Sequence, residues 1–160
     1  MYSNLKIVPI KQPEQDACGP IALEIATQYF KKNLSFLDIT NVIDYDKNEG
    51  MSNADMVVAV KKLELEANII VGTSWEELKS QNTLDTIIIV SWMLHGYIGH
   101  FSVIDHVTDT HVYLNNPETG MIDEIEKIMF MRLWFDYDDL WYPEKNTDIQ
   151  LRWMLLVNET

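Results

Sequence analysis

The side chain with the strongest nucleophilic potential in this sequence is Cys18, which is the only cysteine. It directly precedes a run of helical character, and Pro20 suits a first helical turn because its missing N–H would have no partner there anyway. A thiol at a helix N-terminus feels the positive end of the helix dipole and unpaired backbone N–H groups, which favour the thiolate. The pattern predicts an activated cysteine at the start of a helix that ends near Lys32. The alternative is a small core residue that precedes a helix by chance.

Three other polar residues have the types that nucleophilic catalysis requires. Gln12 lies six residues before Cys18, His100 follows a glycine at the start of an apolar run, and Asn116 precedes a proline. A cysteine peptidase needs a nucleophile, a base, a group that orients the base, and donors for the developing oxyanion. Gln12, Cys18, His100 and Asn116 together cover these needs.

The order and spacing of these motifs resembles the papain-like cysteine peptidases. The resemblance is closest to the double-glycine peptidases that cut leader peptides from bacteriocin precursors, and to their stand-alone peptidase-like relatives. Their pattern is a Gln, five residues and Cys-Gly-Pro or Cys-Gly-Ala, then Gly-His before an apolar strand, then Asp-Pro. The resemblance runs over residues 12–117 and extends into the tail.

The resemblance implies a role for each residue. Cys18 is the nucleophile, and His100 is the base that later protonates the leaving amine. Asn116 orients the imidazole, and Gln12 donates to the oxyanion together with the backbone N–H of Cys18. Asn116 departs from the family, which usually carries Asp at this position. Papain resembles this chain in having the Asn version of the motif. A neutral orienter supports the imidazolium less than a carboxylate does.

Two residues compete with these assignments. Gln15 competes with Gln12, and only the family spacing favours Gln12. His106 shares a strand face with His100 if the strand is regular, and it is rejected as the base mainly because it breaks the family spacing. No metal site is expected, because no second cysteine exists and no histidine pair has the spacing of a zinc protease.

The length predicts one domain over residues 1–160, and the resemblance implies that it is a papain-like peptidase domain. The sequence is 47% hydrophobic and 23% charged, which is ordinary for a globular protein. It lacks a signal peptide pattern, and its longest apolar run, Ile87–Leu94, is too short to cross a bilayer. A single cysteine fits a reducing compartment, so a cytoplasmic location is expected.

The net charge is −13, with 25 acidic and 12 basic side chains. This balance argues against nucleic acid and anionic membrane surfaces as partners. It permits a basic peptide or protein partner, although solubility alone is the simpler explanation. No cofactor is expected, and the sequence leaves the oligomeric state open.

The predicted elements form an α+β arrangement, with a helical N-terminal half followed by a C-terminal antiparallel sheet. The resemblance implies the papain-like peptidase fold, in which the helical half packs on the sheet. Ser35, Ser52 and Ser74 each precede an acidic residue by three positions and predict helix starts. Strands are expected near 67–71, 86–92, 100–107, 111–115 and 151–157. A further helix is expected from Asp123 to about Met131.

Three segments remain open. Residues 44–50 resemble the start of a calcium loop, but the glycine is one place late, and a solvated acidic loop is the better interpretation. Trp92, Met93, Leu94 and Tyr97 precede His100 and either line the cleft or belong to the core. The run 134–141 either binds a basic peptide or packs on its own aromatic side chains.

The sequence as a whole predicts a cysteine peptidase that hydrolyses peptide or isopeptide bonds through a thioester acyl-enzyme. One alternative is an acyl transferase or deamidase that uses the same triad. The other is a catalytically weak or inactive module that binds peptides or proteins.

Overall fold

The structure is a computed structural model that describes residues 4–137 and 142–160. Its helices are α1 (Cys18–Tyr29), α2 (Phe36–Val42), α3 (Asn53–Lys62), α4 (Trp75–Gln81), α5 (Lys127–Leu133) and the 3₁₀ turn η1 (Asn146–Asp148). Its strands are β1 (Leu65–Ile70), β2 (Ile87–Leu94), β3 (Ile98–Val107), β4 (His111–Asn116), β5 (Met121–Glu126), β6 (Phe135–Asp136), β7 (Gln150–Leu151) and β8 (Met154–Glu159). The predicted α+β class is confirmed.

Six strands form one sheet in the order β1-β8-β2-β3-β4-β5, and every neighbouring pair is antiparallel. The last strand, β8, lies between β1 and β2. Residues 154–159 therefore join two strands that come earlier in the chain and that do not pair with each other. The short strands β6 and β7 pair separately.

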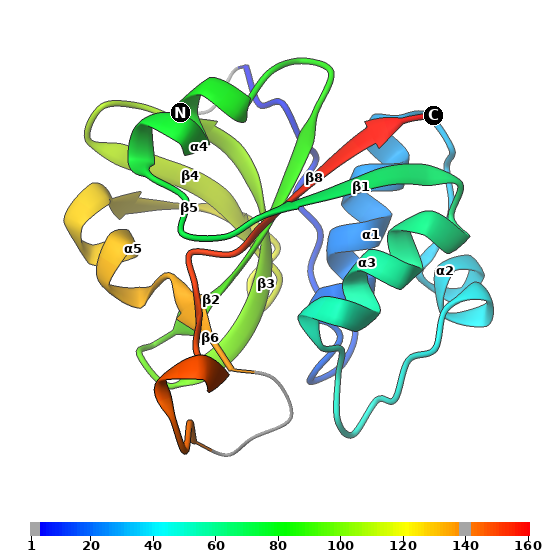
Figure 1. Ribbon diagram of the computed structural model, residues 1–160. Coiled ribbons are helices and arrows are strands. Elements are labelled where there is room, and N and C mark those ends of the chain that lie inside the picture. The colour runs from blue at the N-terminus through cyan, green and yellow to red at the C-terminus, as the bar shows by residue number, and fades with distance from the viewer. Residues whose placement is uncertain (1–3, 138–141) are drawn as a thin grey trace.

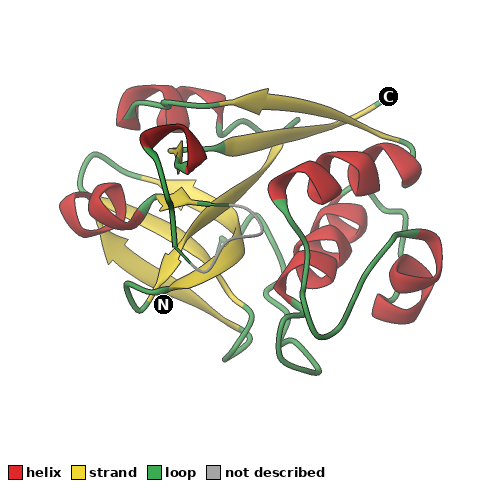
Figure 2. Ribbon diagram, turned by 60° about the horizontal axis from the view of Figure 1, so that its bottom comes forward, coloured by secondary structure: helices red, strands yellow, loops and turns green. Residues whose placement is uncertain are grey.

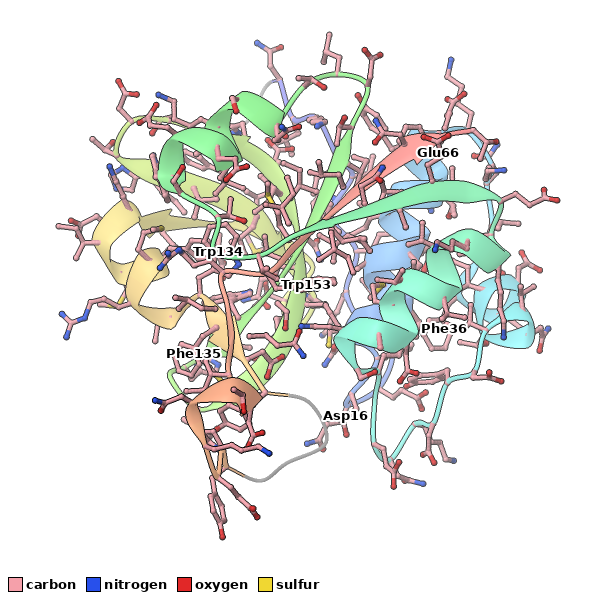
Figure 3. All side chains as sticks on the ribbon, in the orientation of Figure 1. Asp16, Phe36, Glu66, Trp134, Phe135 and Trp153 are labelled. Carbon is pink, nitrogen blue, oxygen red and sulfur yellow. The ribbon has the colours of Figure 1, made fainter. Side chains whose placement is uncertain are left out.

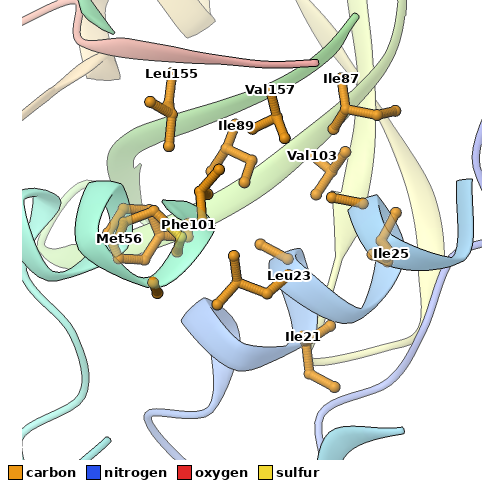
Figure 4. Packing of buried hydrophobic residues seen from close by; sticks show 14 of the residues in the cluster. Ile21, Leu23, Ile25, Met56, Ile87, Ile89, Phe101, Val103, Leu155 and Val157 are labelled. Carbon is orange, nitrogen blue, oxygen red and sulfur yellow. The ribbon is translucent and has the colours of Figure 1, made fainter. Parts of the chain in front are cut away.

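Helices α1, α2 and α3 lie together on one side of the sheet, and α4 and α5 lie on the other (Figure 1). The turned view separates the first three helices from most of the strands (Figure 2). Side chains of α1 such as Ile21 and Ile25 pack against Ile89, Phe101 and Val103 of the sheet (Figure 4). This cluster, which we call the α1 core, holds α1 against β3.

A second cluster fills the opposite face and is called here the tryptophan core. It includes Trp92 and Leu114 from the sheet and Phe130 from α5. Trp134 and Trp153 lie close together at the centre of the molecule, where Trp134 Nε1 donates to the Trp153 carbonyl over 2.9 Å (Figure 3). Side chains of β3 alternate between the two faces of the sheet, so Phe101 lies in the α1 core and Ile104 lies in the tryptophan core.

The three predicted serine caps are confirmed. Ser35, Ser52 and Ser74 each accept from the backbone N–H three residues later, and the first two form full capping boxes. These bonds satisfy N–H groups that have no partner within the helix, so local sequence determines where α2, α3 and α4 begin.

The helix predicted from Asp123 to Met131 is wrong at its start. Residues 121–126 form β5, and α5 begins only at Lys127. Ile122 is buried and pairs with Asn115 of β4, and Ile125 is half-buried and pairs with Val112. Pairing with β4 outweighs the weak helix-start signal of Asp123. No helix among the described residues is long and apolar enough to cross a membrane.

Candidate active site

Cys18 is the first residue of α1, as predicted. The preceding residue, Ala17, provides no side-chain cap, so the first turn keeps backbone N–H groups available. Hydrogen bonds from the backbone N–H groups of Phe101 and Gly19 act on the thiol, together with its own N–H. Phe101 directly follows His100 in β3, so the thiol lies beside the backbone of the predicted base.

Burial nevertheless raises the pKa of the Cys18 thiol to about 11. The hydrogen bond from Phe101 lowers the pKa, the nearby charge of Asp16 raises it, and the Gly19 and Cys18 N–H groups lower it. Asp16 is labelled in Figure 3, on the loop that leads into α1. Desolvation exceeds the effect of the helix N-terminus, so the predicted thiolate is not the stable form in this geometry.

His100 lies in β3 opposite Trp92 of β2, and its ring centroid is 6.3 Å from that of Trp92. It is only 6% exposed, and its buried Nε2 atom has no hydrogen-bond partner among residues 4–137 and 142–160. Burial, followed by the nearby charge of His95, lowers the pKa of His100 to about 4. The imidazole is therefore neutral at pH 7, with one ring nitrogen available for a partner.

Cys18 and His100 are close in the fold, but they do not form a bonded pair. Within the described part of the chain, no hydrogen bond joins Cys18 Sγ to the His100 ring. Phe101 points into the α1 core, whereas His100 alternates with it and faces Trp92. The structure shows a neutral thiol and a neutral imidazole on either side of one strand backbone.

The backbone of Gln12 is held close to Asn116, the predicted orienting residue. Its backbone N–H donates to the Pro117 carbonyl over 2.6 Å, and Pro117 directly follows Asn116. Gly120 permits this approach, because a Cβ atom there would lie 2.8 Å from Lys11 Cβ. Gln12 Oε1 is buried without a partner, whereas Gln15 is exposed. Of the two candidates, Gln12 has the surroundings of a site residue.

Asn116 ends β4, and its amide group is fixed on both sides. Its Nδ2 donates to Asp123 Oδ2 over 2.8 Å, and its Oδ1 accepts from the Glu118 N–H over 2.9 Å. Among the hydrogen bonds of the described residues, none joins Asn116 to His100. The pairing of β3 with β4 reaches Ile104 and Leu114 but not these two residues.

His106 does not share the face of His100. The register of β3 shifts by one residue between Ile104 and His106, so His106 pairs with Tyr113 and stacks on its ring at 4.0 Å. Its Nδ1 atom lies 2.7 Å from the buried carboxylate of Asp105. The shared face predicted for His100 and His106 required a regular strand. The irregularity at Asp105 turns His106 away from the site.

Polar residues that lie near His100 at β3 were not predicted from the sequence. Ser91 is buried and donates to Asp136 Oδ2 over 2.5 Å. A Cβ atom on Gly99 would lie 3.0 Å from Asp136 Oδ1, so the glycine before His100 leaves room for this carboxylate. Asp136 belongs to the aromatic and acidic run at 134–141, and only its distance in sequence concealed the contact.

The sequence left open whether the residues just before His100 line a cleft or belong to the core, and the structure gives different answers for them. Trp92, Met93 and Leu94 are buried in the core, whereas Tyr97 is 75% exposed. In the run 134–141, Trp134 is buried and donates to Trp153, and residues 138–141 lie outside the described residues. Among the residues that the structure describes, no group of three or more His, Cys, Asp or Glu could hold a metal ion.

Two backbone contacts thus connect the helical half with the strands that carry the predicted base and orienter. The first joins Cys18 to Phe101, directly after His100. The second joins Gln12 to Pro117, directly after Asn116. All four predicted residues are brought to one region, although no side-chain hydrogen bond among those found in the described part of the chain connects them to one another.

The fold is similar to that of known peptidase domains. The peptidase domain of Streptococcus ComA, a bifunctional ABC transporter, is 18% identical, with a TM-score of 0.72 over 95% of this chain and 98% of that one. A double-glycine-motif protease from an AMS/PCAT transporter, solved with its leader peptide, is 21% identical, with a TM-score of 0.72 over 96% and 92%. The ComA peptidase domain of Streptococcus mutans is 16% identical, with a TM-score of 0.63 over 94% and 98%.

No curated protein matches the sequence significantly. The match to a family profile is decisive, since residues 6–138 match the Peptidase C39 family. This range includes all four predicted site residues. The chain therefore belongs to the Peptidase C39 family of cysteine peptidases.

Proposed function

We propose that the chain hydrolyses peptide or isopeptide bonds with Cys18 as the nucleophile and His100 as the base. The observation that supports the proposal is that Cys18 begins α1 and packs against the α1 core, to which Phe101, the residue directly after His100, also belongs. The chemistry requires the imidazole to turn toward the sulfur, because the two groups are not bonded in the resting geometry.

In the first step, His100 takes the Cys18 proton while the sulfur attacks the carbonyl carbon of the substrate. The oxyanion that forms accepts hydrogen bonds from the Gln12 side chain and the Cys18 N–H. His100 then gives its proton to the leaving amine, which leaves a thioester on Cys18. Water, deprotonated by His100, attacks the thioester and releases the carboxylic acid and the free thiol.

Asn116 accepts an imidazole N–H in this scheme and keeps the tautomer correct. Because it is neutral, Asn116→Ala weakens turnover less than Cys18→Ala or His100→Ala. Equal loss in all three variants would contradict this ranking.

The substrate is a peptide, since a relative of this fold was solved with a leader peptide bound. We extend this to cleavage after a Gly-Gly pair as a working choice of substrate. The negative charge of the chain favours a substrate with basic residues. We also propose that residues 1–160 act as one domain and that the protein works in the cytoplasm, where a single thiol stays reduced.

The test uses two quenched fluorescent peptides that differ only in Gly-Gly versus Ala-Ala before the cleavage position. We expect hydrolysis of the Gly-Gly peptide that disappears in Cys18→Ala. Gln12→Ala should lower the rate by about 10²–10³-fold, while Gln15→Ala serves as the matched control and leaves it unchanged. Hydrolysis that persists in Cys18→Ala, or its absence in the wild type, would contradict the proposal.

A second candidate function is peptide binding without turnover. The separation of the neutral Cys18 and His100 groups favours it. It predicts that the Gly-Gly peptide binds equally well to the wild type and to Cys18→Ala by calorimetry, with no cleavage of the peptide by either protein.

A further inference from the structure

Three polar residues lie on neighbouring strands and on the same face of the sheet. Asp123 is in β5, Asn116 is in β4 and His100 is in β3, and these strands are adjacent in the sheet. Asp123 pairs with Leu114, two residues before Asn116, so the two side chains are diagonal neighbours on one face. Continuing the Ile104–Leu114 register would place Asn116 opposite Ser102, with His100 two residues further on the same face.

The orientation of the Asn116 amide follows from its partners. The Asp123 carboxylate only accepts, so it must face Nδ2, and the Glu118 N–H only donates, so it must face Oδ1. The amide cannot be reversed without losing both bonds. Oδ1 keeps a second lone pair, so an amide held this way keeps an acceptor for His100 on the side away from Asp123.

The carboxylate also affects the strength of that acceptor. A charged partner on Nδ2 polarises the amide and increases the negative charge on Oδ1. Family members carry the carboxylate itself at the position of Asn116. In this chain an acidic side chain lies one hydrogen bond further away, on the next strand.

We propose that Asp123 is a positioning residue for catalysis, which fixes and polarises the Asn116 amide so that it can orient His100 in place of the family aspartate. This inference rests on the proposed peptidase function. It assigns a role in the reaction to a residue outside the family motif, and it explains how the neutral Asn116 is compatible with turnover.

The test is a charge exchange between the two residues. Asp123→Ala is expected to lower kcat for the Gly-Gly peptide by about tenfold with KM unchanged, because it removes one charge-assisted hydrogen bond. Asn116→Asp alone places two carboxylates in contact and should lower kcat by a similar factor. The double variant N116D/D123N restores one carboxylate and one amide in exchanged positions, and its kcat should return to within about threefold of the wild type.

Glu124→Gln is the matched control, because it removes the same charge from the neighbouring position on the other face of β5 and should leave kcat unchanged. Thermal unfolding of each variant separates a folding defect from a positioning defect. Recovery in the double variant supports the proposal. A kcat equal to wild type in Asp123→Ala, or a double variant no better than the single ones, overturns it.

A wild type without Cys18-dependent hydrolysis would refute the peptidase function instead. The rate at which a Gly-Gly peptide chloromethyl ketone alkylates Cys18 at pH 8 then decides the positioning role, since this probe occupies the peptide site and needs no turnover. The same order of rates, with wild type and N116D/D123N above both single variants, supports the proposal, and equal rates overturn it.

Discussion

The two ends of strand β3 each carry a histidine, and the histidines differ in every physical respect. His100 is buried, faces Trp92 and has a ring nitrogen without a partner. His106 is partly exposed, stacks on Tyr113 and lies 2.7 Å from the Asp105 carboxylate. A buried polar atom without a hydrogen bond costs free energy. The comparison teaches that His106 has the contacts of a residue that stabilises the fold, whereas the surroundings of His100 agree with its proposed role as the base.

The largest expected effect separates the two histidines by activity. His100→Ala should lower hydrolysis of the Gly-Gly peptide by at least about 10³-fold, because the base is lost. His106→Ala should keep turnover within a few-fold of the wild type and lower only the melting temperature. The comparison fails if both variants lose turnover equally at a temperature where both are folded.

The next effect concerns the Asp105 end of the strand. Asp105 Oδ1 accepts from the backbone N–H groups of Lys6 and Ile7, and Oδ2 contacts His106. Asp105→Ala leaves all three donors without their acceptor and should lower the free energy of unfolding by about 3 kcal/mol. Urea denaturation measures this change. His106→Ala is the comparison variant, and it should lose less because the Lys6 and Ile7 bonds remain.

The third effect concerns the thiol beside His100. Since burial raises the pKa of Cys18 to about 11 from an ordinary 9.0, its thiolate fraction at pH 7 is about 100-fold lower than that of an unfolded cysteine. Iodoacetamide should therefore label the folded protein more slowly than the urea-unfolded protein by about this factor. Fast labelling at pH 6 that disappears in His100→Ala would show instead that the ion pair exists without substrate.

The smallest effect is the acid response of stability. The folded-state pKa of His100 is lowered to about 4 from an ordinary 6.5, so the unfolded state takes up a proton first as the pH falls. Stability is lost between about pH 6.5 and pH 4, with about 2 kcal/mol lost from pH 7 to pH 5. His100→Gln should lose about that much less over the same range. Equal losses in the two proteins would show that other groups dominate.

The sequence predicted the elements that depend on neighbouring residues. Ser35, Ser52 and Ser74 begin helices because each cap bond reaches only three residues. The family motif predicted that Cys18 starts α1 and that His100 lies near the start of a strand. These features depend on short segments and on a spacing that the motif preserves.

Features that depend on distant contacts were not predictable. Asp123 was assigned to a helix because its pairing with β4 is invisible in the local pattern. The shift between Ile104 and His106 depends on Asp105 bonding to the N-terminal segment about a hundred residues earlier. The raised pKa of Cys18 results mainly from burial of the thiol by residues that are distant in the sequence. The position of the thiol at a helix end is only one contribution to that pKa.

The position of β8 has a consequence for the order in which the protein folds during synthesis. Strands β1 and β2 are not paired with each other, and residues 154–159 fill the space between them. Leu155 and Val157 of β8 complete the α1 core, so the layer that supports α1 and Cys18 stays open until the ribosome has released this segment. A nascent chain therefore carries its thiol on an incomplete α1 core until β8 has been translated and released.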